Sequence, residues 1–251
     1  MLALAAVFGC ALVSTSARAL VGGAPVATQE IARSVVGLVG PRNLFCTATV
    51  ITRDVLLTAG HCAQPGASYR AQFKGADGAR QFSEITAIER PPQFKTGPSG
   101  ITTSADLGLA KAVRPFPADI GSAAIGLASP PVWPGDKFLV VGGGIPFRGL
   151  HETGVNRSAV LVATGPFLPL QMVLIDLSGK DIGACSGDSG SPVFDTKNEG
   201  AKVVGVVSWA GGPHNTKGCG GLTGATPLAP YRDWIEETIR QLDGDNRGDI
   251  K

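Results

Sequence analysis

Short apolar segments recur along the whole chain, and glycine, proline and polar residues separate them. Most of these segments are rich in valine, isoleucine and threonine and are too short for helices, so the pattern predicts β-strands. The predicted strands are residues 34–40, 45–51, 55–59, 81–88, 106–112, 137–141, 158–163, 171–177, 191–194 and 203–209. Regular spacing of such segments indicates a β-sandwich or a β-barrel.

The C-terminal end carries a different pattern, in which apolar residues recur at the spacing of one helix face. These residues are Tyr231, Trp234, Ile235, Ile239 and Leu242. Pro230 suits the first turn of such a helix and Gly244 suits its end. The residues that follow are polar, so we expect a frayed tail over 244–251.

Prolines gather between residues 114 and 134, which marks a linker between two halves of the chain. We therefore place a boundary after residue 120 and expect one domain over 20–120 and a second over 121–243. A length of 251 residues allows one large or two small compact domains, and a hydrophobic content of 43% is enough to form their cores.

Residues 1–19 have the pattern of a secretory signal peptide. Residues 2–13 are apolar, too few to span a bilayer, and Ala17, Arg18 and Ala19 form an A-x-A cleavage site. No lysine or arginine precedes the apolar run, and a lipoprotein signal that ends at Cys10 is a second interpretation. We expect cleavage after Ala19 and a secreted or periplasmic protein.

The formal net charge of +2 gives no reason to expect binding to nucleic acid or to a membrane surface. No cluster has the spacing of a metal site, and we expect neither a metal nor a cofactor. Beyond residue 19 the cysteines are Cys46, Cys62, Cys185 and Cys219. An even number of cysteines in an exported chain suggests disulfides, and four of them allow three pairings.

Two short strings carry the candidate chemistry, T-A-G-H-C at residues 58–62 and C-S-G-D-S-G-S-P at residues 185–192. Ser189 lies between two glycines, which permit a tight turn that exposes the hydroxyl. Ser186 and Ser191 are close by, but neither lies between two glycines, as Ser189 does between Gly187 and Gly190. Ser189 is therefore the candidate nucleophile, and its hydroxyl needs a base that takes its proton.

The candidate base is His61, which follows an apolar strand, whereas His151 and His214 lie in polar, turn-like stretches. The base needs an acceptor that holds it in the right tautomer. Asp106 has alanine and leucine as neighbours, and a buried carboxylate needs a partner such as an imidazole N–H. Asp54 is a rival, but it lies at a predicted turn.

At both strings the chain resembles the trypsin/chymotrypsin-like serine peptidases, whose hallmarks are T-A-(A/G)-H-C and G-D-S-G-(G/S)-P. The resemblance implies an all-β fold in which two six-stranded antiparallel β-barrels pack face to face, with a C-terminal α-helix. The barrel over 20–120 would hold His61 and Asp106, and the barrel over 121–243 would hold Ser189. The family's D-I-A-L motif is D-L-G-L at Asp106, a mild departure.

The resemblance assigns further roles around the nucleophile. The backbone N–H groups of Gly187 and Ser189 would form the oxyanion hole that stabilises the tetrahedral intermediate. Asp188 would pair with the free amino terminus, because L-V-G-G after Ala19 is similar to the family's I-V-G-G start. We therefore expect Leu20 to begin the mature chain, with no zymogen stage.

By the same resemblance, the base of the pocket for the P1 residue, the one before the cleaved bond, lies six residues before Ser189. Gly183 stands there and offers no charge for arginine or lysine, although Asp181 is only two residues away. Ala210 replaces a glycine that admits large side chains, so we expect cleavage after small or medium apolar residues. The opposite wall should fall near residues 223–225. The expected pocket residues are Gly183, Ala184, Ser208, Trp209, Ala210 and Gly224.

The resemblance also implies the disulfides Cys46–Cys62 and Cys185–Cys219, and a hydrogen bond from Ser208 to Asp106. Thr47 and Ala48 stand where glycines are usual. Few disulfides and the direct junction between signal and mature chain favour a bacterial-type member. The leading prediction is a monomeric endopeptidase that acts on polypeptides and binds protein inhibitors. A catalytically silent binding protein with the same fold and an esterase are the alternatives.

Overall fold

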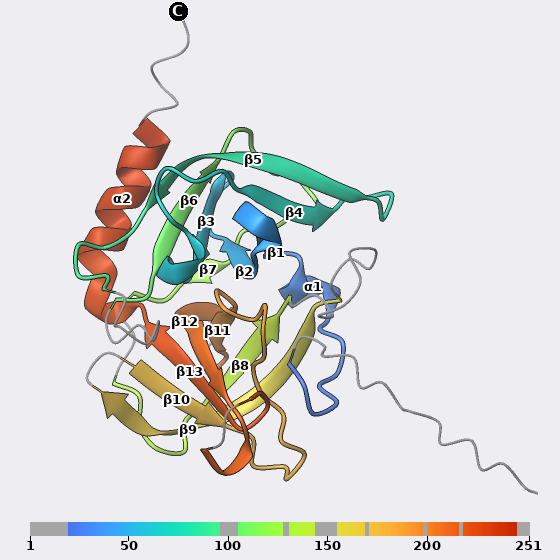
Figure 1. Ribbon diagram of the computed structural model, residues 1–251, viewed down its shortest axis with the longest axis vertical. Coiled ribbons are helices and arrows are strands. Elements are labelled where there is room, and N and C mark those ends of the chain that lie inside the picture. The colour runs from blue at the N-terminus through green and yellow to red at the C-terminus, as the bar shows by residue number, and fades with distance from the viewer. Residues whose placement is uncertain are drawn as a thin grey trace, which may run out of the picture.

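The computed structural model describes residues 20–95, 105–127, 131–143, 155–168, 171–197, 200–215 and 218–244. Each of the ten segments predicted as strands falls on a strand. The strands form two barrels that pack against each other, and a helix runs along the side of the first (Figure 1). The expected signal peptide, Cys10 and His151 lie outside the described residues.

The first barrel is closed, with strand order β1-β2-β3-β6-β5-β4 and antiparallel neighbours throughout. Its strands are β1 (Val35–Val39), β2 (Phe45–Val50), β3 (Val55–Thr58), β4 (Arg70–Lys74), β5 (Arg80–Glu89) and β6 (Gly108–Ala112). The buried side chains of β1, β2, β3 and β6 fill its interior, because on these strands the valine, leucine and alanine residues are almost all buried.

The second barrel has the order β11-β8-β9-β10-β13-β12, and pairing of β11 with β12 closes it. Its strands are β8 (Lys137–Gly142), β9 (Arg157–Leu168), β10 (Gln171–Ile175), β11 (Pro192–Asp195), β12 (Lys202–Gly211) and β13 (Leu222–Pro227). The predicted all-β fold of two six-stranded antiparallel barrels is confirmed. A short strand that was not predicted, β7 (Ala124–Ile125), adds to β12 in parallel.

The C-terminal helix α2 (Arg232–Gly244) is confirmed, but it begins later than Pro230. Pro230 lies instead in a 3₁₀ turn, η4 (Ala229–Tyr231), that leads into the helix. Ile235 and Leu242 are buried in the same apolar cluster as the first barrel, so the helix that follows the second barrel packs on the first. A further helix, α1 (Gln29–Ala32), spans one turn and was not predicted. Among the described helices, none is long and apolar enough to cross a membrane.

Candidate active site

Two neighbouring strands of the first barrel bring His61 and Asp106 together. His61 lies in a 3₁₀ turn, η2 (Gly60–Cys62), just after β3, and Asp106 lies just before β6. The end of β3 pairs with the start of β6, so the two residues meet at one edge of the barrel. The distance from His61 Nδ1 to Asp106 Oδ2 is 2.8 Å, and the backbone N–H of His61 donates to Asp106 Oδ1 at 2.9 Å.

The Asp106 carboxylate is fully buried and accepts hydrogen bonds from the His61 ring, the His61 backbone and a third donor. The third is the hydroxyl of Ser208, which donates to Oδ2 at 2.5 Å from the second barrel. Burial by itself would raise the pKa of Asp106, but the bonds and charge from His61 and the bond from Ser208 together hold that pKa below its ordinary value. The carboxylate therefore stays ionised and holds Nδ1 of His61 as the protonated nitrogen, which leaves Nε2 free to accept a proton.

The rival acid, Asp54, is paired elsewhere. Its Oδ1 lies 2.9 Å from the Nζ of Lys111, and both side chains are buried. His214 lies in a different turn, η3 (Pro213–Asn215), and is exposed. Of the candidates that the structure describes, His61 and Asp106 are the pair in contact.

The loop that carries Ser189 needs glycine at positions 187 and 190. Gly187 has φ of 91° and Gly190 has φ of 89°, in the left-handed region that other residues rarely adopt. A Cβ on Gly190 would lie 1.9 Å from the carbonyl oxygen of Thr47, so no side chain fits there. Ser189 is partly exposed, whereas Ser191 is fully buried.

The Ser189 loop is joined to the part of the first barrel that holds His61. The backbone N–H of Thr47 donates to the carbonyl oxygen of Ser189 at 2.8 Å. Thr47 follows Cys46, which is bonded to Cys62, the neighbour of His61. The Ser189 loop of the second barrel is therefore linked to the His61 segment of the first through Thr47 and the Cys46–Cys62 disulfide.

The predicted oxyanion donors are available. Among the described residues, the N–H groups of Gly187 and Ser189 have no hydrogen-bond acceptor. Neighbouring N–H groups of the loop do have acceptors, since Asp188 donates to the carbonyl of Cys185 and Gly190 donates to that of Val207. Backbone N–H groups without an acceptor are the donors that an oxyanion hole requires.

Asp188 lies at the centre of a buried contact with the start of the described chain. Its Oδ2 accepts hydrogen bonds from the backbone nitrogens of Leu20 and Cys185, each at 2.9 Å. Leu20 is only 1% exposed. In the full chain the Leu20 nitrogen is an amide N–H, which occupies the place that an ammonium group would take after cleavage at Ala19.

The two disulfides are the predicted ones, Cys46–Cys62 and Cys185–Cys219. The first lies beside His61, and its two sulfurs and a ring nitrogen of His61 lie within 4.8 Å of one another. Because the sulfurs are bonded to each other, this group offers no thiolate to a metal ion. The second disulfide ties the Ser189 loop to the segment before β13.

Of the residues expected near the opposite wall of the pocket, Thr223 lies beside Gly183, whereas Gly224 lies beside Trp209. Thr223 is fully buried, and its Oγ1 accepts a hydrogen bond from the N–H of Ala184 at 3.0 Å. A Cβ on Gly183 would lie 3.2 Å from that same oxygen. A Cβ on Gly224 would instead meet the Trp209 ring at 2.0 Å. Side chains alternate along β13, so only one of the two neighbours can face Gly183.

The remaining pocket residues lie on β12 and in the loop before Ser189. Trp209 stacks on Gly224 and donates from Nε1 to Oε1 of Gln171 at 3.2 Å. Ala210 is partly buried and pairs with Thr223 across the two strands. Asp181 is exposed, whereas Gly183 is buried, so the carboxylate of Asp181 is not part of the buried pocket base.

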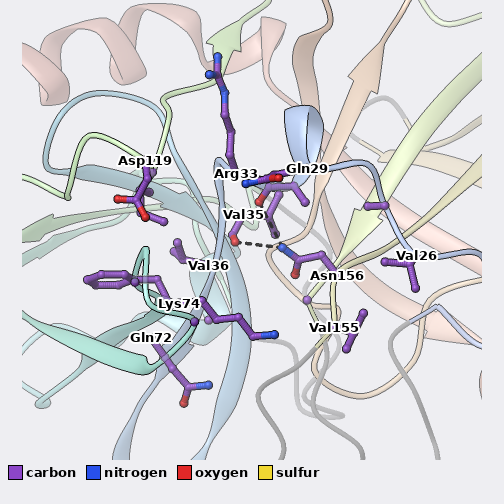
Figure 2. Close-up of a pocket in the computed structure, with 18 of the residues that line it drawn as sticks. Val26, Gln29, Arg33, Val35, Val36, Gln72, Lys74, Asp119, Val155 and Asn156 are labelled. Atoms are coloured by element: carbon purple, nitrogen blue, oxygen red, sulfur yellow. Dashed lines mark hydrogen bonds between the residues drawn. The ribbon is translucent and has the colours of Figure 1, made fainter.

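A cavity of about 550 Å³ lies elsewhere, between the first barrel and the start of β9. Figure 2 shows the Lys74 side chain extending across it from β4 toward the side formed by Val155 and Asn156. Asn156 donates from Nδ2 to the carbonyl oxygen of Val35 at 3.2 Å. The residues that line the cavity include none of the predicted catalytic residues, so the cavity is separate from the His61 site.

Comparison with protein families places this geometry in a known context. Residues 20–235 match the family model described as Trypsin. The chain belongs to the trypsin family. Its relatives there are serine endopeptidases, hydrolases that act on polypeptides.

The chain is 29% identical to trypsin of Sarcophaga bullata, over 79% of this chain and 80% of that protein. It is 26% identical to putative trypsin-6 of Homo sapiens, over 78% and 80%. Rat transmembrane protease serine 9 is 27% identical over 91% of this chain, which spans only 23% of that protein's length. The relatives are mostly animal proteins, so the comparisons do not confirm the expected bacterial type.

Among solved structures, human heparin binding protein superposes with a TM-score of 0.66. The likeness covers 87% of this chain and 96% of that chain at 21% identity, and it shows the shared fold.

Thr47 and Thr223 are the residues of the site whose contacts sequence reasoning missed. The only signal was that Thr47 departs from the usual glycine and that Thr223 lies next to the expected wall residue.

Proposed function

We propose that this protein is a secreted serine endopeptidase that works through a Ser189–His61–Asp106 acyl-enzyme mechanism. One observation carries the proposal: a buried carboxylate holds Nδ1 of His61, while a loop joined to the same barrel edge presents Ser189 and two free N–H groups. This combination supplies a base, a nucleophile and donors for an oxyanion, which acyl transfer requires.

The reaction follows from these groups. Ser189 Oγ attacks the carbonyl carbon of the substrate, its proton passes to Nε2 of His61, and the carbonyl oxygen becomes an oxyanion held by the N–H groups of Gly187 and Ser189. Collapse of the intermediate breaks the C–N bond, and His61 returns the proton to the leaving amine. Water then attacks the acyl-enzyme by the same route and releases Ser189.

The pocket supports cleavage after small or medium apolar residues. Gly183 carries no charge, and Thr223 and Ala210 add side-chain volume to the two strands beside it. A buried, uncharged and narrow pocket does not stabilise the charge of arginine or lysine. One methylene group in such a pocket separates substrates by about 1–3 kcal/mol, so we expect graded discrimination among apolar residues.

The test is labelling of the protein that begins at Leu20 with a serine-reactive phosphonate. We expect stoichiometric labelling at Ser189, none in Ser189→Ala, and cleavage of a peptide library with alanine or valine preferred at P1. Labelling that persists in Ser189→Ala would reject the assigned nucleophile, and a clear arginine or lysine preference would reject the pocket.

The second candidate is a catalytically silent binding protein, which the structural likeness to human heparin binding protein favours. The presence of His61, Asp106 and Ser189 in this chain argues against it, because silent relatives usually lose one of the three. Failure of correctly processed protein to react with the phosphonate would favour this candidate.

The site also fits the expected setting of the protein. Residues 1–19 would direct export, and two disulfides are stable in an oxidising compartment outside the cytosol or in a periplasm. We propose polypeptides as substrates, protein inhibitors as further partners and a monomer as the working form.

A further inference from the structure

Thr47 is a fully buried residue of β2 whose contacts reach the second barrel. It stands where glycine is usual in the resembled family. Its backbone N–H donates to the carbonyl oxygen of Ser189 at 2.8 Å, and its carbonyl oxygen accepts from Oγ1 of Thr58, also at 2.8 Å. The backbone of Thr47 thus lies between the nucleophile loop and the strand that precedes His61.

The side chain of Thr47 adds two contacts that glycine cannot make. Its hydroxyl donates to the carbonyl oxygen of Gly187 at 2.8 Å and accepts from the N–H of Gly143 at 3.2 Å. A hydroxyl has one proton to donate, and here that proton is used by Gly187. The orientation of the Thr47 hydroxyl is therefore set by both barrels, since Thr47 lies in the first and Gly143 follows β8 of the second.

We infer that Thr47 is a positioning residue for the oxyanion hole, an inference that rests on the proposed function. Thr47 binds the carbonyl oxygens of Gly187 and Ser189, the same two residues whose N–H groups are the expected oxyanion donors. The Gly187 carbonyl is part of the Gly187–Asp188 peptide, which connects the peptide that carries the Gly187 N–H to the peptide that carries the Ser189 N–H. Gly187 has φ of 91° and the wide conformational freedom of glycine. The Thr47 hydroxyl restrains the peptide that lies between the two donors and so limits the orientation of both.

Three variants separate this role from simple packing. Thr47→Val keeps the shape of the side chain and removes the hydroxyl, whereas Thr47→Ser keeps the hydroxyl. Thr49→Val is the matched control, because Thr49 lies on the same strand, is equally buried, and its Oγ1 has no hydrogen-bond partner among the described residues. If Thr47→Val does not fold, Thr47→Ala removes the same hydroxyl and takes its place.

The first readout compares a tetrapeptide aldehyde that carries alanine at P1 with the matching peptide alcohol. Ser189 Oγ adds to the aldehyde carbon, its proton passes to His61, and the carbonyl electrons move to the oxygen, which occupies the oxyanion hole. The alcohol binds without forming this oxyanion. The ratio of the two inhibition constants therefore reports the hole and not the pocket.

We expect Thr47→Val to lower the advantage of the aldehyde over the alcohol at least about 10-fold, since loss of one oxyanion donor costs about 10²–10³ in kcat. We expect Thr47→Ser to retain it within about threefold and Thr49→Val to leave it unchanged, with kcat following the ratio and KM holding steady. An unchanged ratio in Thr47→Val, or an equal loss in Thr49→Val, would overturn the inference.

The second readout does not need activity. The Gly143 amide loses its acceptor in Thr47→Val, so we expect its hydrogen exchange to be faster at least about 10-fold there and to be close to wild type in Thr47→Ser and Thr49→Val. Equal exchange in all four proteins would overturn the bridge. If wild-type protein does not react with the phosphonate, the proposed function fails, while the exchange rates still decide whether Thr47 joins the two barrels.

Discussion

Asp106 illustrates how single residues set the chemistry of this site. A fully buried carboxylate is normally unfavourable, yet here it accepts hydrogen bonds from the His61 ring, the His61 backbone and Ser208. These donors favour the charged form, so the pKa of Asp106 lies below its ordinary value in spite of burial. The same bonds that fix the tautomer of His61 therefore also stabilise the folded protein.

The lowered pKa predicts how stability depends on pH. The folded state holds Asp106 ionised more firmly than the unfolded state, so its contribution is complete above the unfolded pKa of about 3.9 and is lost as pH falls through the lower folded pKa. We expect the difference in free energy of unfolding between wild type and Asp106→Asn to shrink as the pH falls below about 4. Urea unfolding at each pH measures it, and a difference that grows in acid would contradict the prediction.

Some residues of the site could be predicted and others could not. His61 and Ser189 stand in short motifs whose residues are required by the local backbone, such as the glycines that adopt positive φ around Ser189. Thr47 meets Gly187 only in the folded molecule, 140 residues apart, and no local pattern reports such a contact. The choice between Thr223 and Gly224 depends on which face of β13 points inward, and that register is set by pairing with β12.

Most strands could also be predicted from the sequence, whereas three could not. Several predicted strands, such as β3 and β10, are continuous apolar runs that are buried on both faces and so show no polar alternation. Strand β5 was predicted although none of its residues is fully buried. The missed strands are β4, which has only two buried residues, β7, which spans two residues, and β13, which contains glycine and proline. Strand β4 forms because β1 and β5 pair with it on either side, which its own five residues do not reveal.

Helix α2 is joined to the first barrel by a buried charge as well as by apolar packing. Nζ of Lys111, on β6, lies 2.9 Å from Asp54 and 3.4 Å from Asp243, near the end of the helix. The side chains of Lys111 and Asp54 are each 8% exposed, whereas that of Asp243 is 48% exposed. Because β6 begins at Gly108, two residues after Asp106, this pairing also supports the strand next to the carboxylate that binds His61.

Lys111→Met should remove the cation that balances the buried charge of Asp54 and lower the free energy of unfolding by about 3–5 kcal/mol. Adding Asp54→Asn to Lys111→Met removes that charge and should recover most of the loss. Asp243→Asn should lower the free energy of unfolding by less than about 1 kcal/mol, because Asp243 is half exposed and lies farther from Lys111 than Asp54 does. Urea denaturation compares the three proteins, and equal losses in Lys111→Met and Asp243→Asn would refute the assigned burial of the pair.

At the scale of the whole molecule, the two barrels each supply part of the site, and the start of the described chain completes it. His61 and Asp106 come from the first barrel, Ser208 and the Ser189 loop come from the second, and Thr47 connects them. Leu20 lies against Asp188 within that loop, 168 residues away in the chain. The Ser189 loop therefore contacts Leu20, the residue at which we expect the mature chain to begin.

The chemical state of the Leu20 nitrogen should decide activity. An ammonium group at 2.9 Å from Asp188 forms a buried ion pair, whereas an amide N–H at the same place forms only a hydrogen bond. We expect protein that begins at Leu20 to react with the phosphonate faster than protein extended by Ala19.

Asp188→Asn in the shorter chain leaves the ammonium half-paired, which costs about 3–5 kcal/mol and should slow labelling more than about 100-fold. Asp181→Asn, an exposed acid near the same loop, is the control and should leave labelling unchanged. Equal labelling of the two chain lengths, or N-terminal sequencing that finds a start other than Leu20, would refute activation by signal cleavage.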